Sequence, residues 1–338
     1  MEDKYKEVLE QYAFEVNAME RIRGAFLLET DEGIRMLKEV SSTENKLEFE
    51  HRITELLKKR GFKKTDPFVR NLEEKLVSCN QKGERYVVKE WFRAVECNPR
   101  DLRQITEVAG KLGQLHKVLE KTDISAAQLD GDTSVVYSET NQIANCEKHN
   151  RELRKMKNYL KSKRQKNLFE QELLEAFEIY FGQAEEALDR LKKSGYQEMA
   201  GAALENGSIC HGSFSYHNAL LADGDIAIVN FEHAHLGLQL MDLYYFMRKV
   251  MEKNAWNETF GKSLLEAYHK EKPLKKEELR LLEIMFLYPD KYWKIANHYL
   301  NGKKTWIAWK NVEKLRSLTQ TEKNKLTFTG KHLRTLYF

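Results

Sequence analysis

The 338-residue chain has a formal net charge of +4 and is 41% hydrophobic and 32% charged, which supports a packed core in one or two domains and excludes wholesale disorder. Its four cysteines are widely spaced, so we expect free thiols rather than a zinc site or a disulfide framework. There is no run of about 18 apolar residues and no signal-peptide pattern, so we expect a cytoplasmic protein with no membrane partner. The small net charge also makes nucleic acid an unlikely partner.

The first hundred residues predict a small sheet with one helix inserted after its third strand. Apolar runs separated by turn signals are typical of strands, and an apolar stripe of helical period that ends at a glycine is typical of a helix. The predicted strands occupy residues 14–40, where three form a meander, and residues 74–79 and 85–92; the helix occupies residues 43–60.

From about residue 100 onward the pattern is mainly helical. Helices are predicted in residues 102–119, 168–192, 239–253 and 275–300, and residues 148–166 hold nine Lys or Arg. Two short apolar strands, 219–221 and 226–229, interrupt this pattern, and Asp223-Gly224 between them is a hairpin turn signal. The chain is therefore expected to be α+β, with the strands mostly in its N-terminal part.

One motif stands out from this background. It begins with His211-Gly212-Ser213, continues to Asn218, and after the hairpin ends with Asn230-Phe231-Glu232. It resembles the H-G-D-x-x-x-x-N and D-F-D signatures of the aminoglycoside phosphotransferase and choline kinase superfamily, which is related to protein kinases. The resemblance implies a two-lobed protein-kinase-like fold. Residues 1–92 would form the nucleotide lobe, and residues 93–338 a helical lobe that contains the catalytic-loop-like hairpin of residues 208–232.

The resemblance also implies roles for the residues of the motif. Ser213 occupies the position of the acid that accepts the proton of the substrate hydroxyl, and Asn218 the position of a magnesium ligand. Asn230 occupies the position of the principal metal-binding acid, and Glu232 is a candidate substitute ligand. His211 is expected to orient the loop through hydrogen bonds.

Other candidates follow from the same resemblance. Lys38, in the third strand, is expected to contact the nucleotide phosphates, and the following helix offers Glu50 as its ion-pair partner. Glu48 and Glu55 compete with Glu50 for that role, and the sequence does not decide between the three. Asp242 is expected to brace the catalytic loop.

The strand that ends in Glu90, Trp91 and Phe92 would lead into the hinge, where backbone groups of this superfamily hold adenine. The phosphate-binding loop is poorly marked, because Gly24 is the only glycine between the first two strands. Arg21 or Arg23 could contact phosphates in its place, although solvated turn residues are the simpler interpretation.

A narrower resemblance covers nearly the whole chain. The chain resembles the CotS-type spore coat protein family in four segments. These are residues 238–254, residues 288–299, the basic stretch, and residues 183–188 after it. This resemblance implies a protein made in the mother-cell cytoplasm that ends in the spore coat, with other coat proteins as partners.

The two changed acids bear on activity. A serine hydroxyl is not a base near neutral pH, and loss of a general base lowers the rate about 10²- to 10⁴-fold. The amide at Asn230 lacks the negative charge that Mg²⁺ favours in a ligand. The superfamily implies ATP and magnesium as cofactors, and these changes predict that their binding is weak or absent. Two hypotheses follow: a pseudokinase that acts in coat assembly, and an atypical ATP-dependent phosphotransferase acting on a small-molecule or coat-glycan hydroxyl.

Several further features keep two interpretations each. His233 and His235 could bind a metal or be surface residues, and His217 could be catalytic or pack within its loop. Residues 148–166 could bind an anionic polymer or form a solvated helix face. The aromatic residues near the C-terminus could form a ligand cage or part of the core; they are Tyr292, Trp293, Tyr299, Trp306 and Trp309.

Overall fold

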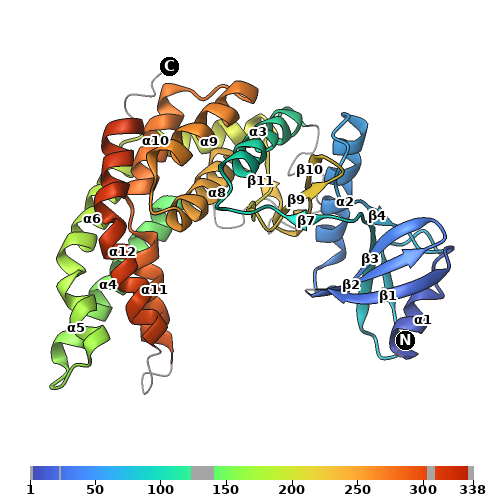
Figure 1. Ribbon diagram of the computed structural model, residues 1–338, viewed down its shortest axis with the longest axis horizontal. Helices are drawn as coiled ribbons and strands as arrows, with labels where there is room; N and C mark the ends of the chain where they lie inside the picture. Colours follow the sequence, from blue (N-terminus) through green and yellow to red (C-terminus); the bar gives the residue numbers. More distant parts are fainter. Residues whose placement is uncertain (1–2, 23, 123–140, 303–308, 334–338) are drawn as a thin grey trace.

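The computed structural model describes residues 3–22, 24–122, 141–302 and 309–333. An antiparallel sheet forms the N-terminal lobe, and the remainder is mainly helical, as Figure 1 shows. The predicted α+β fold class is therefore confirmed. The lobe boundary predicted at residue 92 stays a prediction.

The N-terminal sheet has the strand order β1-β2-β3-β6-β4, with β5 also paired to β6. Its strands are β1 (Val16–Ile22), β2 (Ala25–Thr30), β3 (Gly33–Glu39), β4 (Phe68–Val69), β5 (Val77–Cys79) and β6 (Arg85–Glu90). Helix α1 (Asp3–Leu9) packs Val8 and Leu9 against Leu28 and Leu37 of the sheet. Helix α2 (Glu44–Lys59) packs Leu47 against Val87. The sequence patterns predicted neither α1 nor β4.

Short strands connect this lobe to the helical part. β7 (Val95–Glu96) pairs with β9 (Ala219–Ala222), which forms a hairpin with β10 (Asp225–Ile228). β8 (Ile209–Cys210) pairs with β11 (His235–Leu236). Asp223 and Gly224 adopt positive φ, as the predicted hairpin turn requires. The motif segment, residues 211–232, therefore contributes its hairpin to one small sheet and is flanked in sequence by the two strands of the other. Figure 1 places it between the N-terminal sheet and the helices.

The helical part builds the main hydrophobic core. Its elements are α3 (Leu102–Val118), α4 (Gln142–Ser162), α5 (Leu168–Glu175), α6 (Phe177–Lys192), α7 (Tyr196–Glu205), α8 (Leu240–Lys253), α9 (Glu258–Glu271), α10 (Lys276–Leu287), α11 (Asp290–Asn301), α12 (Trp309–Thr327) and the π-helical turn η4 (Phe328–His332). α3 and α9 approach closely at Gly113, where a Cβ would lie 2.9 Å from the Tyr268 carbonyl oxygen. No helix in the described ranges is long and apolar enough to cross a bilayer.

Two segments that were each predicted as one long helix form two consecutive helices in the structure. Residues 168–192 divide at Ala176, which ends α5 and begins α6. Residues 275–300 divide at Pro289, because proline cannot donate the hydrogen bond that a continuous helix needs and displaces the preceding turn. Helices α7 and α9 were not predicted. The basic stretch falls mostly on α4, whose helix begins earlier, at Gln142.

Candidate functional site

The loop that carries the motif is shaped by close contact with the segment after the hairpin. Gly212 has φ +80°, and a Cβ there would lie 1.9 Å from the carbonyl oxygen of His233. Glycine is therefore required at this position on both conformational and steric grounds. Pairing of Cys210 with His235 fixes the same two segments against each other.

His211, the first residue of the motif, is fully buried. Its Nε2 lies 3.0 Å from the Val229 carbonyl oxygen, and its ring packs on Phe231 and Phe214. Burial lowers the pKa of His211, so the ring is neutral near pH 7 and donates to Val229. The side chain therefore contacts the Val229 carbonyl oxygen and two aromatic rings, and its role in orienting the loop stays a prediction.

Asp242 binds the start of the loop from the N-terminus of α8. Its carboxylate accepts the backbone N–H of His211 at 2.6 Å and that of Gly212 at 2.9 Å, and lies 3.2 Å from Nε2 of His116. Burial would raise the pKa of Asp242, but the hydrogen bond from His116 and the electrostatic influence of the neighbouring histidines together outweigh burial and lower the pKa. These are the contacts of a residue that braces the loop.

The side chains at the motif's catalytic and metal positions bond to one another. The amide nitrogen of Asn230 donates to Oδ1 of Asn218 at 3.0 Å, and the amide nitrogen of Asn218 donates to the Ser213 carbonyl oxygen at 3.1 Å. Asn230 has φ +66°, a left-handed conformation that asparagine tolerates better than most residues. The three positions thus form a neutral chain of hydrogen bonds.

Lys38 lies on β3 as predicted, but Glu50 is not its partner. The Lys38 ammonium is 2.6 Å from Oε2 of Glu232, in the motif segment. Glu48 and Glu55 do not replace Glu50 either: Glu48 lies near Arg70, and no contact between Glu55 and Lys38 occurs within the described residues. Burial would raise the pKa of Glu232, but the hydrogen bond and charge of Lys38 lower it.

Glu50 instead belongs to a buried triad that the sequence analysis missed. Lys89 of β6 lies 2.6 Å from Glu50 and 2.8 Å from Asp66, and all three side chains are at most 5% exposed. Burial would lower the pKa of Lys89, but the two carboxylates outweigh it and raise the pKa. Asp66 also accepts the backbone N–H of Asn230 at 3.1 Å. The triad therefore links α2, the sheet and the motif segment.

A cavity of about 880 Å³ opens between the N-terminal sheet and the motif segment. Lys38, Asn218, Asn230 and Glu232 line it. The predicted hinge residues Trp91 and Phe92 line it as well, with their rings stacked at a centroid distance of 5.4 Å. The structure thus brings the predicted nucleotide and metal residues together around one space, apart from Glu50 and Glu90.

The first two backbone donors of the predicted hinge are already used. The Glu90 N–H donates to Pro67, and the Trp91 N–H donates to Ile34, so neither is available to adenine. Strands β1 and β2 turn sharply at Gly24, where Ile22 pairs directly with Ala25. Arg21 is exposed and does not line the cavity, and Arg23 lies outside the described residues.

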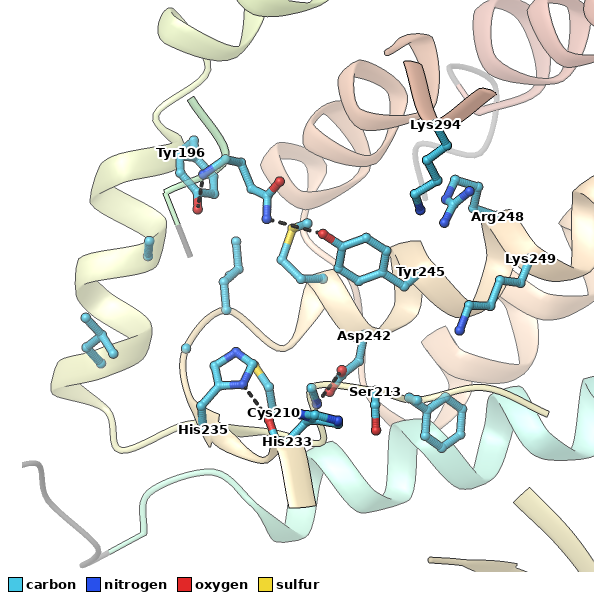
Figure 2. Close-up of a pocket in the computed structure, with 18 residues that line it drawn as sticks. Tyr196, Cys210, Ser213, His233, His235, Asp242, Tyr245, Arg248, Lys249 and Lys294 are labelled. Carbon is cyan, nitrogen blue, oxygen red and sulfur yellow. Dashed lines mark hydrogen bonds between the residues drawn. The ribbon is translucent and has the colours of Figure 1, made fainter. Parts of the chain in front are cut away.

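A second cavity, of about 450 Å³, lies on the other side of the loop and is shown in Figure 2. Gly212 is among its lining residues. In Figure 2, Ser213 and Asp242 form its floor, while Arg248 and Lys249 of α8 and Lys294 of α11 extend along one wall. Ser213 therefore faces this cavity, whereas Asn218 and Asn230 face the larger one. No cluster of three or more metal-ligating side chains occurs in the described part of the chain.

The sequence matches one family model over nearly its whole length. The family is described as "Spore coat putative kinase YutH", and the match spans residues 5–332. The chain belongs to this family. A comparison with curated proteins found no match.

Solved structures share the fold of this YutH-family chain at low sequence identity. An aminoglycoside phosphotransferase from Alicyclobacillus acidocaldarius subsp. acidocaldarius is 18% identical, with a TM-score of 0.85 over 98% of this chain and 96% of that one. A spectinomycin phosphotransferase solved with ADP and spectinomycin is 13% identical, with a TM-score of 0.62 over 94% of each chain. An amicoumacin kinase solved with AMP-PNP and Ca²⁺ is 11% identical, with a TM-score of 0.59 over 97% and 92%. These likenesses establish a phosphotransferase-like fold.

Most of the histidine and aromatic residues that kept two interpretations in the sequence make contacts within the YutH-family chain. His217 lies 2.7 Å from Glu96 at the surface, and His235 contacts the His233 carbonyl oxygen. Trp293 stacks on His149 and donates to Glu152, while Tyr292 and Tyr299 are buried. Trp309 is exposed, and Trp306 lies outside the described residues.

The basic stretch of the YutH-family chain is partly neutralised. Three of its cations pair with acids of the next helices: Arg154 with Glu185, Lys157 with Glu178, and Lys163 with Glu170. Paired charges on an amphipathic helix favour a solvated face over a binding site for an anionic polymer.

Proposed function

We propose that this chain is a catalytically impaired, kinase-like protein that is made in the mother-cell cytoplasm, ends in the spore coat, and acts in coat assembly by binding other coat proteins. Its membership in a spore coat family supports the location. The observation that carries the impairment is the neutral chain Ser213–Asn218–Asn230, in which the side chains at the metal positions hydrogen-bond to each other.

The loop has no carboxylate at the position of the proton-accepting acid. Nδ1 of His211 lies 3.5 Å from the Ser213 hydroxyl and 3.4 Å from the Ser213 backbone nitrogen, and burial lowers the pKa of this ring, so it is a weak base. Loss of a general base lowers the rate of a proton-transfer step by about 10²- to 10⁴-fold. The fold can therefore still position ligands, although it does not provide a strong base for the proton transfer.

The residues at the metal positions do not fit a magnesium ion well. Oδ1 of Asn218 already accepts a hydrogen bond from Asn230, and Glu232 is paired with Lys38. Mg²⁺ favours carboxylate oxygens in near-octahedral geometry, and Glu232 is the only carboxylate at these positions of the motif.

Calorimetric titration of the purified chain with ATP, with and without Mg²⁺, tests the proposal. We expect either no binding or weak binding that Mg²⁺ does not strengthen, because Lys38 is already paired with Glu232 and the other two metal positions carry the neutral amides of Asn218 and Asn230. Mg²⁺-dependent transfer of phosphate from ATP to an acceptor, abolished by Lys38→Ala, would contradict the proposal.

A double substitution that restores both acids tests the assignment of the motif. Ser213→Asp with Asn230→Asp is expected to raise Mg²⁺ affinity, because it places a carboxylate at the metal position and another at the base position. The measurement is the shift in melting temperature on adding Mg²⁺ with ATP. Ser317→Asp with Asn301→Asp adds the same two charges on exposed helix faces and should show no shift. An equal response in both double variants would show that the motif positions are misassigned.

The second candidate function is an atypical ATP-dependent phosphotransferase acting on a hydroxyl of a small molecule or coat glycan. One observation favours it: Lys38, Asn218 and Glu232 are all retained and line one cavity. Positioning and electrostatics supply most of the catalysis in phosphoryl transfer, so a missing base need not abolish it. Failure to bind ATP with Mg²⁺ at millimolar concentrations rules this candidate out.

A further inference from the structure

The smaller cavity, beside Ser213, has an unusual balance of charge. Among the residues that the structure describes, its lining contains three basic side chains, Arg248, Lys249 and Lys294, and one acid, Asp242. The carboxylate of Asp242 is buried and is already bound by two backbone amides and His116. It is therefore committed to the loop and offers little negative charge to a ligand.

Two of the three cations have partners beyond the cavity wall. Asp290 lies 3.2 Å from Arg248 and 2.9 Å from Lys294, and Arg248 also bonds to Glu252 at 2.7 Å. Arg248 is only 7% exposed, yet its Nε has no hydrogen-bond partner among the described residues. A buried guanidinium donor left unpaired is costly unless a ligand or water accepts its hydrogen.

Lys249 is the cation without a direct partner in the described structure, although the nearby charge of Glu252 offsets part of its own. The structure shows no hydrogen bond or ion pair for its ammonium with any described residue, although the side chain is half-buried. In Figure 2 the ammonium points into the cavity, toward the floor that Ser213 and Asp242 form. Burial lowers the pKa of Lys249, and the charges of Arg248 and Lys294 lower it further. A bound anion would relieve both effects.

The rest of the wall can bind hydroxyl groups. The Tyr245 hydroxyl accepts from Gln142 at 3.4 Å, the Tyr196 hydroxyl accepts from the Gln142 backbone, and Figure 2 shows both near the upper edge of the cavity. The volume of about 450 Å³ lies within the usual range for small-molecule sites and accommodates a single sugar ring.

We propose that this cavity binds a hydroxylated organic anion of monosaccharide size, whose phosphate or carboxylate group is held by Lys249. A cationic amino sugar would meet like charges along the α8 wall and is disfavoured. The inference does not rest on the proposed function, because the cavity lies on the opposite side of the loop from the nucleotide and metal residues. Its test omits nucleotide, so the two can fail separately.

The test is calorimetric titration of the full chain, without nucleotide, using four probes that share one ring: glucose 6-phosphate, glucuronate, glucose and glucosamine. We expect at least one of the two anions to bind about tenfold or more tighter than glucose, since a hydrogen bond to a charged group contributes about 1.5–3 kcal/mol. Glucosamine should bind no tighter than glucose. The stronger of the two anions identifies whether phosphate or carboxylate is the recognised group.

Lys249→Met should weaken binding of that anion about tenfold while leaving the weak binding of glucose unchanged. Lys253→Met is the matched control, because Lys253 lies one turn later on α8, is exposed, and contacts the Tyr216 ring outside the cavity. Melting curves of both variants should match that of the parent chain. Equal affinity for glucose and both anions, no binding of either anion at millimolar concentration, or a folded Lys249→Met variant that binds like the parent would each overturn the proposal.

Discussion

Replacing Lys89 with Met is expected to lower the free energy of unfolding by about 3–5 kcal/mol, because it leaves Glu50 and Asp66 buried without their cation. Lys89 contacts these carboxylates at 2.6 and 2.8 Å, and neither carboxylate is more than 5% exposed. Methionine fills a similar volume, so the loss reflects charge rather than a cavity. Urea denaturation followed by circular dichroism measures the effect.

The exposed pair Lys75–Glu73 provides the control for this substitution. Its 2.7 Å separation matches that of the buried pairs, but both side chains are more than two-thirds exposed. Lys75→Met should therefore change the stability by less than about 0.5 kcal/mol. Adding Glu50→Gln to Lys89→Met should recover part of the loss, because it removes one of the two orphaned charges. A Lys89→Met effect no larger than that of Lys75→Met would show that the triad does not contribute to stability.

Asp242→Ala is expected to destabilise the chain by a similar amount, about 3–5 kcal/mol, since each buried donor left unsatisfied costs about 1–3 kcal/mol. The substitution removes the acceptor of the His211 and Gly212 amides and the partner of His116. The motif loop should loosen with it, which faster amide hydrogen exchange in residues 209–218 would report.

Asp189→Ala is the control for the brace, because Asp189 is 63% exposed and pairs only with Lys193 on its own helix within the described structure. It should lose less than about 0.5 kcal/mol. If Asp242→Ala melted like Asp189→Ala and left exchange of the loop amides unchanged, the loop would be held by its other contacts alone.

Local sequence patterns predicted the elements that carry the motif. The hairpin of residues 219–229 was predicted because two apolar runs flank an Asp-Gly turn, a signal contained within a few residues. The break at Pro289 was also marked locally, but the helical period on both sides of it obscured that signal. Ala176 gives no such signal, because alanine favours helix continuation.

The partner of Lys38 could not be predicted, because it depends on pairing between strands far apart in sequence. In the sheet, Lys89 lies opposite Met36, two residues from Lys38, so both lysines project from the same face toward α2. Either could reach Glu50, and the register of β3 with β6 decides the outcome. One signal in the sequence could have revealed the triad. Lys89 lies within the apolar run of β6, where a buried lysine would need acidic partners.

The ion pair between Lys38 and Glu232 places a carboxylate of the chain itself beside the lysine that would bind a phosphate in the larger cavity. A tethered carboxylate competes with any incoming phosphate for the same ammonium at an effective concentration set by the fold, of the order of millimolar or more. A ligand that uses Lys38 must displace this internal competitor, and its apparent affinity falls by the fraction of molecules in which the pair is closed. Lys38 lies on β3 and Glu232 follows β10. The ion pair between them therefore also holds the sheet against the motif segment. The contact between the sheet and the motif segment at Lys38 and Glu232 therefore does not require a bound nucleotide.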